Sequence, residues 1–299
     1  MKIIIAGGSG FIGKHLYHTL NQQGHEVTIL SRSPKNLPAD INTKIWNGTT
    51  LTLSETPDVI INLCGENIAS GRWTESKKRA LINSRIKPTQ AIVNYLKTIQ
   101  TETKPRLMNA SAIGYYPSHP EEQTEACHKK LNESSFSYQL IQRWESSALL
   151  AKDHGCDTCC LRIGVVLGAE GGILNNLKLL HQFKFGALMG EKSSFLSWIH
   201  IIDLCLAISF LLQVPSWEKA YNLVAPQPAS QLEFSRAISQ ANSNIINFPV
   251  PSLLLKFAFG QLAEELMLAN QRILPENLSK AGFKFKYNSI SDSIDNIFK

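Results

Sequence analysis

The sequence predicts an α/β protein with a doubly wound parallel sheet, and three observations lead to this prediction. Short apolar runs typical of buried strands alternate with helical segments through the first half of the 299-residue chain. The stretch "KIIIAGGSGFIG" at 2–13 joins one such strand to a helix through closely spaced glycines. A hydrophobic content of 43% and a charged content of 18% are typical of a globular chain that buries a large core.

The first half of the chain carries the repeating pattern. We expect helices at 14–23, 74–99 and 136–154, where apolar residues recur at helical spacing. Between them, apolar runs that end in glycine or polar residues predict strands at 2–7, 26–32, 44–48, 58–65, 105–116 and 158–168. Right-handed crossovers between such strands leave the doubly wound order as the simplest topology.

After residue 168 the regular alternation of predicted strands and helices ends. We expect a loop at 168–174, an amphipathic helix at 175–186, a short strand and an apolar helix within 194–212, and a strand at 220–226. The chain is therefore divided into a nucleotide-binding domain at 1–225 and a smaller C-terminal α/β lobe at 226–299. Residues 170–198 are expected to contribute to the substrate side of this lobe.

Charge and cysteine content exclude several classes of protein. The formal charge of +6 is spread along the chain in short pairs such as Lys77-Lys78, so we expect no nucleic-acid partner. No apolar run reaches membrane-spanning length, which predicts no membrane partner. Cys156 and Cys159 form a C-x-x-C beside Cys160, but we expect packing in a buried strand rather than a metal site. A reducing cytoplasm is the expected location.

The glycine-rich turn predicts a dinucleotide site. Gly7, Gly10 and Gly13 form G-x-x-G-x-x-G, and Gly8 with the last two also gives G-x-G-x-x-G. Such glycines permit a tight turn and let backbone N–H groups approach a pyrophosphate at the N-terminus of a helix.

The end of the second expected strand predicts which cofactor binds. NAD-binding sites place Asp or Glu near this point, whereas this chain has Ser31 and Arg32. A guanidinium suits the extra phosphate of NADP, and a carboxylate would repel it. We therefore expect NADP(H) as the cofactor.

Four motifs resemble the extended short-chain dehydrogenase/reductase superfamily, whose domain is a Rossmann fold. They are "GGSGFIG" at 7–13, "NLCG" at 62–65, "ASAIGYY" at 110–116 and "WIHIIDL" at 198–204. "NLCGENIASGRW", "RWES", "GGIL" and "LPENLSKAGFKFKY" extend the resemblance to its SulA-related epimerase subgroup, including the C-terminal domain. Besides the three motif glycines, Ser31 and Arg32, the resemblance implies cofactor contacts from Phe11, Ile12, Leu63, Cys64 and Gly65.

The resemblance also implies catalytic residues, and here the chain departs from the superfamily. Ser111 matches the serine that orients the substrate oxygen, but no tyrosine of this sequence is followed by Lys four residues later. Counting back from Glu145 in "RWES" places the expected Lys at Ile141 and the expected Tyr at Ser137. Tyr115 and Tyr116, which follow Ser111, are the alternative candidates; ordinary aromatic packing is the competing interpretation.

Further residues are expected to line the substrate or to hold the core together. Arg72 and Trp73 follow the fourth strand, where the loop should border the substrate, and Arg72 suits a carboxylate or phosphate. We expect Asp203 to cap the following apolar helix, with a structural or substrate-lining role for His200. Arg162 is expected to be buried and paired.

Two functions from different classes fit these observations. One is an NADP(H)-dependent oxidoreductase, either epimerase-like or carbonyl-reducing, acting on a small molecule such as a sugar nucleotide or a carbonyl compound. The other is a non-catalytic NADP(H)-binding protein that senses redox state through a protein partner. A homodimer through the helices at 74–99 and 136–154 is a further expectation.

Overall fold

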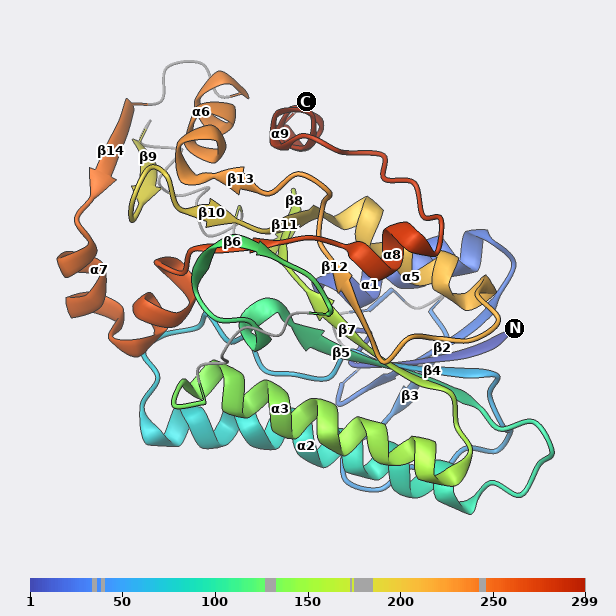
Figure 1. The fold of residues 1–299 in the computed structure, drawn as a ribbon. Helices are drawn as coiled ribbons and strands as arrows, with labels where there is room; N and C mark the ends of the chain where they lie inside the picture. Colours follow the sequence, from blue (N-terminus) through green and yellow to red (C-terminus); the bar gives the residue numbers. More distant parts are fainter. Residues whose placement is uncertain are drawn as a thin grey trace.

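A seven-stranded parallel sheet forms the centre of the molecule in the computed structural model, which describes residues 1–33, 37–38, 41–126, 133–172, 174, 185–241 and 246–298 (Figure 1). The strand order is β12-β7-β5-β4-β1-β2-β3. The strands are β1 (Lys2–Ala6), β2 (Glu26–Ser31), β3 (Thr43–Ile45), β4 (Val59–Asn62), β5 (Arg106–Ala112), β7 (Thr158–Ile163) and β12 (Ala220–Leu223). The predicted Rossmann architecture is confirmed, with the reversal of strand order between β1 and β4.

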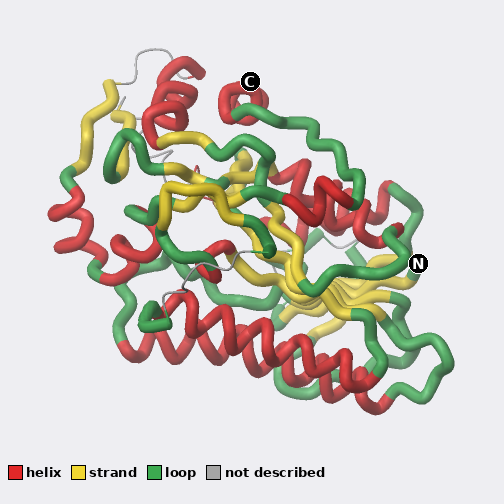
Figure 2. Tube along the Cα trace, in the orientation of Figure 1, coloured by secondary structure: helices red, strands yellow, loops and turns green. Residues whose placement is uncertain are grey.

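Helices cover both faces of this sheet (Figures 1 and 2). Helix α1 (Phe11–Gln22) packs against α5 (Ile201–Gln213) on one face, and α2 (Glu75–Thr98) packs against α3 (Phe136–Leu149) on the other. A 3₁₀ helix, η2 (Leu150–His154), follows α3, so the expected helix at 136–154 changes type at its end. In the described part of the chain, no helix has the length and apolar character needed to span a membrane.

The expected strand at 158–168 is two strands in different sheets. β7 ends at Ile163, and β8 (Val165–Gly168) pairs with β11 (Trp198–His200) instead. Gly164 makes this break possible, because a Cβ there would lie 2.7 Å from both Ser197 O and Val224 Cγ1. The expected strand at 105–116 is likewise shorter, since η1 (Ile113–Tyr115) follows Ala112.

The C-terminal lobe lies beyond the carboxyl ends of the sheet strands. It contains three small pairings: β10 (Phe195–Leu196) with β13 (Ala229–Ser230), β14 (Ile246–Val250) with β9 (Phe185–Met189), and β15 (Gln271–Ile273) with β6 (His119–Gln123). Its helices are α6 (Gln231–Ala241), α7 (Ser252–Phe259), α8 (Glu276–Lys280) and α9 (Ile290–Phe298). Of the helix expected at 175–186, residues 175–184 lie outside the described residues, whereas 185–186 begin β9. The boundary proposed at 225/226 stays a prediction.

The cysteines of the C-x-x-C stretch belong to the core. Cys159 and Cys160 lie in β7 and Cys156 just before it, and all three are buried. Cys156 packs with the apolar residues under α2, and Cys159 with those under α1 and α5. Burial raises the pKa of all three thiols, which keeps them in the neutral form that suits an apolar core.

The start of α5 corrects one expectation. His200, and not Asp203, caps this helix, because His200 Nδ1 accepts a hydrogen bond from Ile202 N at 3.1 Å. Asp203 lies inside the first turn and accepts from Lys286 N at 2.8 Å and from Tyr287 N at 2.9 Å. Asp203 therefore fastens the C-terminal segment to the nucleotide-binding domain.

Acid should destabilise the protein through His200. Burial, with smaller effects from the charges of Lys286 and His15, lowers the pKa of His200 from 6.5 to about 4. Below pH 6.5 the unfolded chain binds this proton before the folded chain does, so stability should fall between pH 6.5 and 4, by up to about 3 kcal/mol. The free energy of urea unfolding at pH 7.5 and pH 5 tests this. His200→Asn keeps a capping side chain and should reduce the difference; an unchanged difference would contradict the assignment.

Candidate functional site

The glycine turn between β1 and α1 shows why each glycine is needed. Gly7 has φ +78°, and a Cβ there would lie 2.9 Å from Cys64 N and from Leu63 C. A Cβ on Gly13 would lie 2.4 Å from Gly8 Cα, so only glycine lets α1 pack this closely on the turn. At Gly10 the nearest atom to such a Cβ is Gly7 O, 3.6 Å away. The turn therefore requires two of the motif glycines for its own geometry and leaves space beside the third.

Phe11 joins this turn to the loop that follows β8. A Cβ added at Gly168 or Gly171 would approach the Phe11 ring to 2.7 or 2.4 Å. The phenyl ring therefore lies directly against this glycine-rich loop, which holds the loop beside the N-terminus of α1. The sequence predicted a loop at 168–174 but gave no signal for this contact. Ile12 is half-buried and packs against the core formed with α5.

The ends of β2 and β4 lie on either side of β1 and bring the expected cofactor residues to one edge. Ser31 is buried, with its Oγ 3.0 Å from Ser9 Oγ of the glycine turn. Arg32 is exposed and makes no hydrogen bond to any residue that the structure describes. Burial raises the pKa of the Cys64 thiol to about 12, and the nearby charge of Arg32 opposes this rise. Arg32 directly follows β2 and Cys64 follows β4 by two residues, so both lie at the carboxyl edge of the sheet.

Leu63 and Gly65 complete this edge. Leu63 N donates to Ala6 O at 2.8 Å, which continues the pairing of β4 with β1 past the end of the strand. A Cβ on Gly65 would lie 3.1 Å from the guanidinium carbon of Arg85, a buried residue of α2. Burial lowers the pKa of Arg85 to about 10.

Ser111 at the end of β5 belongs to a buried network of polar side chains. Its Oγ donates to Glu145 Oε1 at 2.6 Å, and Arg162 binds the same carboxylate through Nε at 2.8 Å and Nη2 at 2.9 Å. Arg162 Nη1 donates to the Tyr116 hydroxyl at 3.0 Å, and that hydroxyl donates to Asn222 Oδ1 at 2.7 Å. The prediction that Arg162 is buried and paired is confirmed.

The two candidate tyrosines have different environments. Tyr116 is 3% exposed, and burial raises its pKa, with Arg162 opposing the rise. Tyr115 is half-buried, and the guanidinium carbon of Arg162 lies 3.5 Å from its ring centre. Tyr115 also packs near Tyr138 of α3, with 5.6 Å between the ring centres. Tyr115 therefore combines a partly accessible ring with a neighbouring cation.

The two α3 positions from which the Tyr and Lys are missing lie against η1. A Cβ added at Gly114 would approach Ser137 Cβ to 3.2 Å and Ile141 Cδ1 to 3.1 Å. Both side chains are buried. The face of α3 that carries both positions therefore points toward the turn after Ser111.

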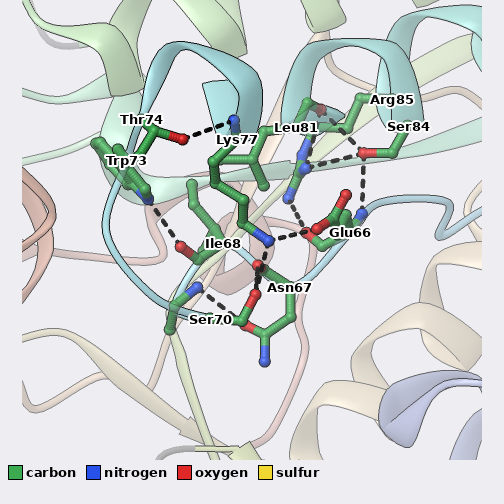
Figure 3. Close-up of polar contacts among 11 residues, drawn as sticks. Glu66, Asn67, Ile68, Ser70, Trp73, Thr74, Lys77, Leu81, Ser84 and Arg85 are labelled. Carbon is green, nitrogen blue, oxygen red and sulfur yellow. Dashed lines mark hydrogen bonds and ion pairs between the residues drawn. The ribbon is translucent and has the colours of Figure 1, made fainter. Parts of the chain in front are cut away.

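Arg72 and Trp73 lie in the loop between β4 and α2. Figure 3 shows Trp73 in this loop. Trp73 is buried, donates from Nε1 to Ile68 O at 2.9 Å and packs against Phe136 of α3. Arg72 is exposed and lies against Gly260, where a Cβ would be 3.3 Å from Arg72 Nη2. Trp73 is thus part of the loop's own packing, and Arg72 is the member of this pair that solvent can reach.

Several residues around this loop were not anticipated. Lys77 forms an ion pair with Glu66, and Arg85 Nη2 donates to Glu66 O at 3.1 Å (Figure 3). Two cations of α2 therefore hold the loop against this helix. Behind it, Asn62 Nδ2 donates to Asn109 Oδ1 at 2.6 Å and to Thr89 Oγ1 at 2.9 Å. "NLC" and "MNA" at the ends of neighbouring strands are the only sequence signal for this contact, since Thr89 comes from a distant helix.

Comparisons with known proteins agree with this architecture. Residues 3–223 match the NAD dependent epimerase/dehydratase family, and residues 250–297 match a domain of unknown function, DUF1731. The epimerase family protein Mb2239 of Mycobacterium bovis is 32% identical over 300 residues, which cover 98% of this chain and 96% of the relative.

Two solved structures are also similar over the whole chain. The human epimerase family protein SDR39U1, solved with NADPH, has a TM-score of 0.89 and 28% identity, and the similarity covers 100% of this chain and 99% of the human one. A nucleoside-diphosphate sugar epimerase of Corynebacterium glutamicum has a TM-score of 0.77 and 28% identity, and this chain spans 58% of it. The family match covers well over half of the chain, and the similarity to the mycobacterial protein extends to almost all of it. The chain belongs to the NAD dependent epimerase/dehydratase family.

Proposed function

We propose that this protein is an NADP(H)-dependent oxidoreductase, epimerase-like or carbonyl-reducing, that acts on a small molecule such as a sugar nucleotide or a carbonyl compound. The observation that carries the proposal is the edge formed by the glycine turn and Arg32. Space is left beside Gly10, where a pyrophosphate would lie, and the end of β2 offers a cation where NAD sites use a carboxylate. The similar human protein was solved with NADPH, which supports the same choice.

In this proposal NADP(H) supplies or accepts the hydride, and the protein binds and orients the cofactor and the substrate. The N–H groups at the start of α1 would hold the pyrophosphate, and Arg32 would hold the 2′-phosphate. The reaction would occur near Ser111, beyond the carboxyl end of β5. Because the single hydroxyl proton of Ser111 is donated to Glu145, the Oγ lone pairs are left to accept a hydrogen bond from a substrate hydroxyl. Arg162 keeps Glu145 in place for this task.

Tyr115 is the better placed of the two candidate tyrosines for contact with substrate. The Tyr116 hydroxyl already has two partners, Arg162 and Asn222, and lies in the interior. Tyr115 is more accessible and lies on the Arg162 guanidinium, a cation close to its phenol. We therefore assign Tyr116 to holding Arg162 and Tyr115 to the substrate side.

The second candidate function is a non-catalytic NADP(H)-binding protein that passes redox state to a protein partner. It is favoured by the missing Tyr-x-x-x-Lys pair and by the burial of Ser111, which is 4% exposed. A homodimer through α2 and α3, and a location in the cytoplasm, are further proposals that accompany either function.

Turnover separates the two functions. NADPH oxidation would be followed by absorbance with a panel of ketones, aldehydes and UDP-sugars. Any turnover should fall about 100-fold or more in Ser111→Ala and be largely kept in Ser111→Thr, which retains the hydroxyl. Equal activity of wild type and Ser111→Ala would contradict the role of Ser111. Tight NADPH binding without turnover of any compound would favour the sensing function.

A further inference from the structure

The N-terminus of α3 is bound by a carboxylate from the far end of the chain. Glu265 Oε2 accepts from Ser137 N at 2.8 Å, and Oε1 accepts from Phe136 N at 3.1 Å. Gln261 Nε2 donates to the same Oε1 at 2.7 Å. One oxyanion thus takes two adjacent N–H groups at the positive end of a 14-residue helix, which is how helix N-termini bind carboxylates and phosphates.

Ser137 provides an independent sign that this helix start is built for more than Glu265. Its side chain is 4% exposed, and its Oγ makes no hydrogen bond within the described part of the structure. A buried hydroxyl without a partner costs free energy, so it calls for a ligand group that is absent from the protein itself. The side chain packs against Gly114, in the turn that directly follows Ser111 and its strand.

Arg72 and the irregular backbone at Gly260 lie near the start of α3. Arg72 is exposed, contacts Gly260 and forms no ion pair with the described residues. Gly260 has φ +59° and ψ −134°, a conformation that is essentially restricted to glycine. Glu265 itself lies in a π-helical turn, Ala263–Met267, a geometry that often marks functional sites. The segment that carries Glu265 therefore has an irregular backbone and lies next to Arg72, which has no ion-pair partner among the described residues.

We propose that the start of α3 is an anion subsite of the substrate site and that Glu265 occupies it when no substrate is bound. A carboxylate or phosphate of the substrate would replace Glu265 on the N–H groups of Phe136 and Ser137. It would also accept from Ser137 Oγ and lie in the field of Arg72. The proposal rests on the proposed function, because it names an oxyanion as part of that substrate.

Removal of the internal carboxylate should open the subsite to small anions. Thermal unfolding and calorimetry of the full chain would be measured with inorganic phosphate, with acetate and with chloride at equal ionic strength. We expect Glu265→Ala to gain a phosphate-dependent rise in Tm of a few degrees that the wild type lacks. Adding Ser137→Ala or Arg72→Ala to Glu265→Ala should remove most of this gain. A rise in Tm with phosphate but not with acetate would show that the subsite accepts phosphate only. A rise with each of the two ions would show that it also accepts a carboxylate.

Two controls make the outcome decisive. Glu264→Ala removes the neighbouring carboxylate, which pairs with Lys256, and should behave as the wild type. If Glu265→Ala does not fold, Glu265→Gln removes the charge with little change of shape and should show a smaller gain, because its amide oxygen can still accept from one of the two N–H groups. No anion dependence in a folded Glu265 variant, or an equal dependence in Glu264→Ala, would overturn the proposal. NADPH titration of the same variants reports separately on the cofactor site, so failure of the subsite and failure of the proposed function can be told apart.

Discussion

Replacing Arg162 with methionine should lower the free energy of unfolding by about 3–5 kcal/mol. The side chains of Arg162 and Glu145 are 5% and 6% exposed, so the substitution leaves a carboxylate in the interior without its two guanidinium bonds. Tyr116 loses one partner at the same time. Urea unfolding followed by circular dichroism measures the loss.

A double variant and a surface variant serve as controls for this prediction. Glu145→Leu/Arg162→Met removes both charges and should recover part of the lost stability, because a buried pair can often be replaced by apolar residues. Arg272→Ala breaks an exposed pair with Glu122 and should cost less than about 1 kcal/mol. If Arg162→Met costs no more than Arg272→Ala, the buried network does not stabilise this site.

Alanine at Gly13 should mainly lower stability, whereas alanine at Gly10 should mainly weaken NADPH binding. Gly13→Ala places a Cβ 2.4 Å from Gly8 Cα, so α1 must shift and the protein should lose about 3 kcal/mol of stability. Gly10→Ala adds a methyl group in ordinary contact with Gly7 O, at φ −77°, and should cost no more than about 1 kcal/mol, because Gly10 is the N-cap of α1, where glycine is preferred over alanine. The same methyl group would occupy the space proposed for the pyrophosphate, so NADPH binding should weaken about 100-fold or more.

Urea unfolding and NADPH titration of both variants check this pair of expectations. Gly24→Ala is a suitable reference, because Gly24 has φ +81° and no atom within 4 Å of an added Cβ. It should cost some stability through backbone strain and leave NADPH binding unchanged. Normal NADPH affinity in Gly10→Ala would mean that the cofactor does not approach this turn.

The nucleotide-binding domain could be predicted from the sequence because its signals are local. The apolar run at 2–7 and the glycines after it specify β1, the turn and α1 within about a dozen residues. The identity of the capping residue at α5 could not be predicted in this way. His200 and Asp203 are both able to cap, and only the partner segment at Lys286 and Tyr287 shows that Asp203 serves elsewhere.

The part of the site that was missed depends on contacts across long stretches of sequence. Glu265 binds the start of α3 although the two are more than 120 residues apart in the sequence. Nothing around Glu265 in "LAEELM" indicates that role. The apolar run at 158–168 reads as one strand, although Gly164 divides it because Ser197 and Val224 leave no room for a side chain. Ser111, in contrast, was found from its motif, whereas its hydrogen bond to Glu145 of α3 became apparent only from the structure.

Calorimetric titration of the purified full chain with NADPH and with NADH tests the central claim most directly. We predict binding of NADPH that is at least about tenfold tighter than that of NADH, and a preference that disappears in Arg32→Ala because the 2′-phosphate loses its cation. Equal affinity for both cofactors, or a preference that survives Arg32→Ala, would contradict the assignment of Arg32. Binding of neither cofactor would contradict the proposed function as a whole.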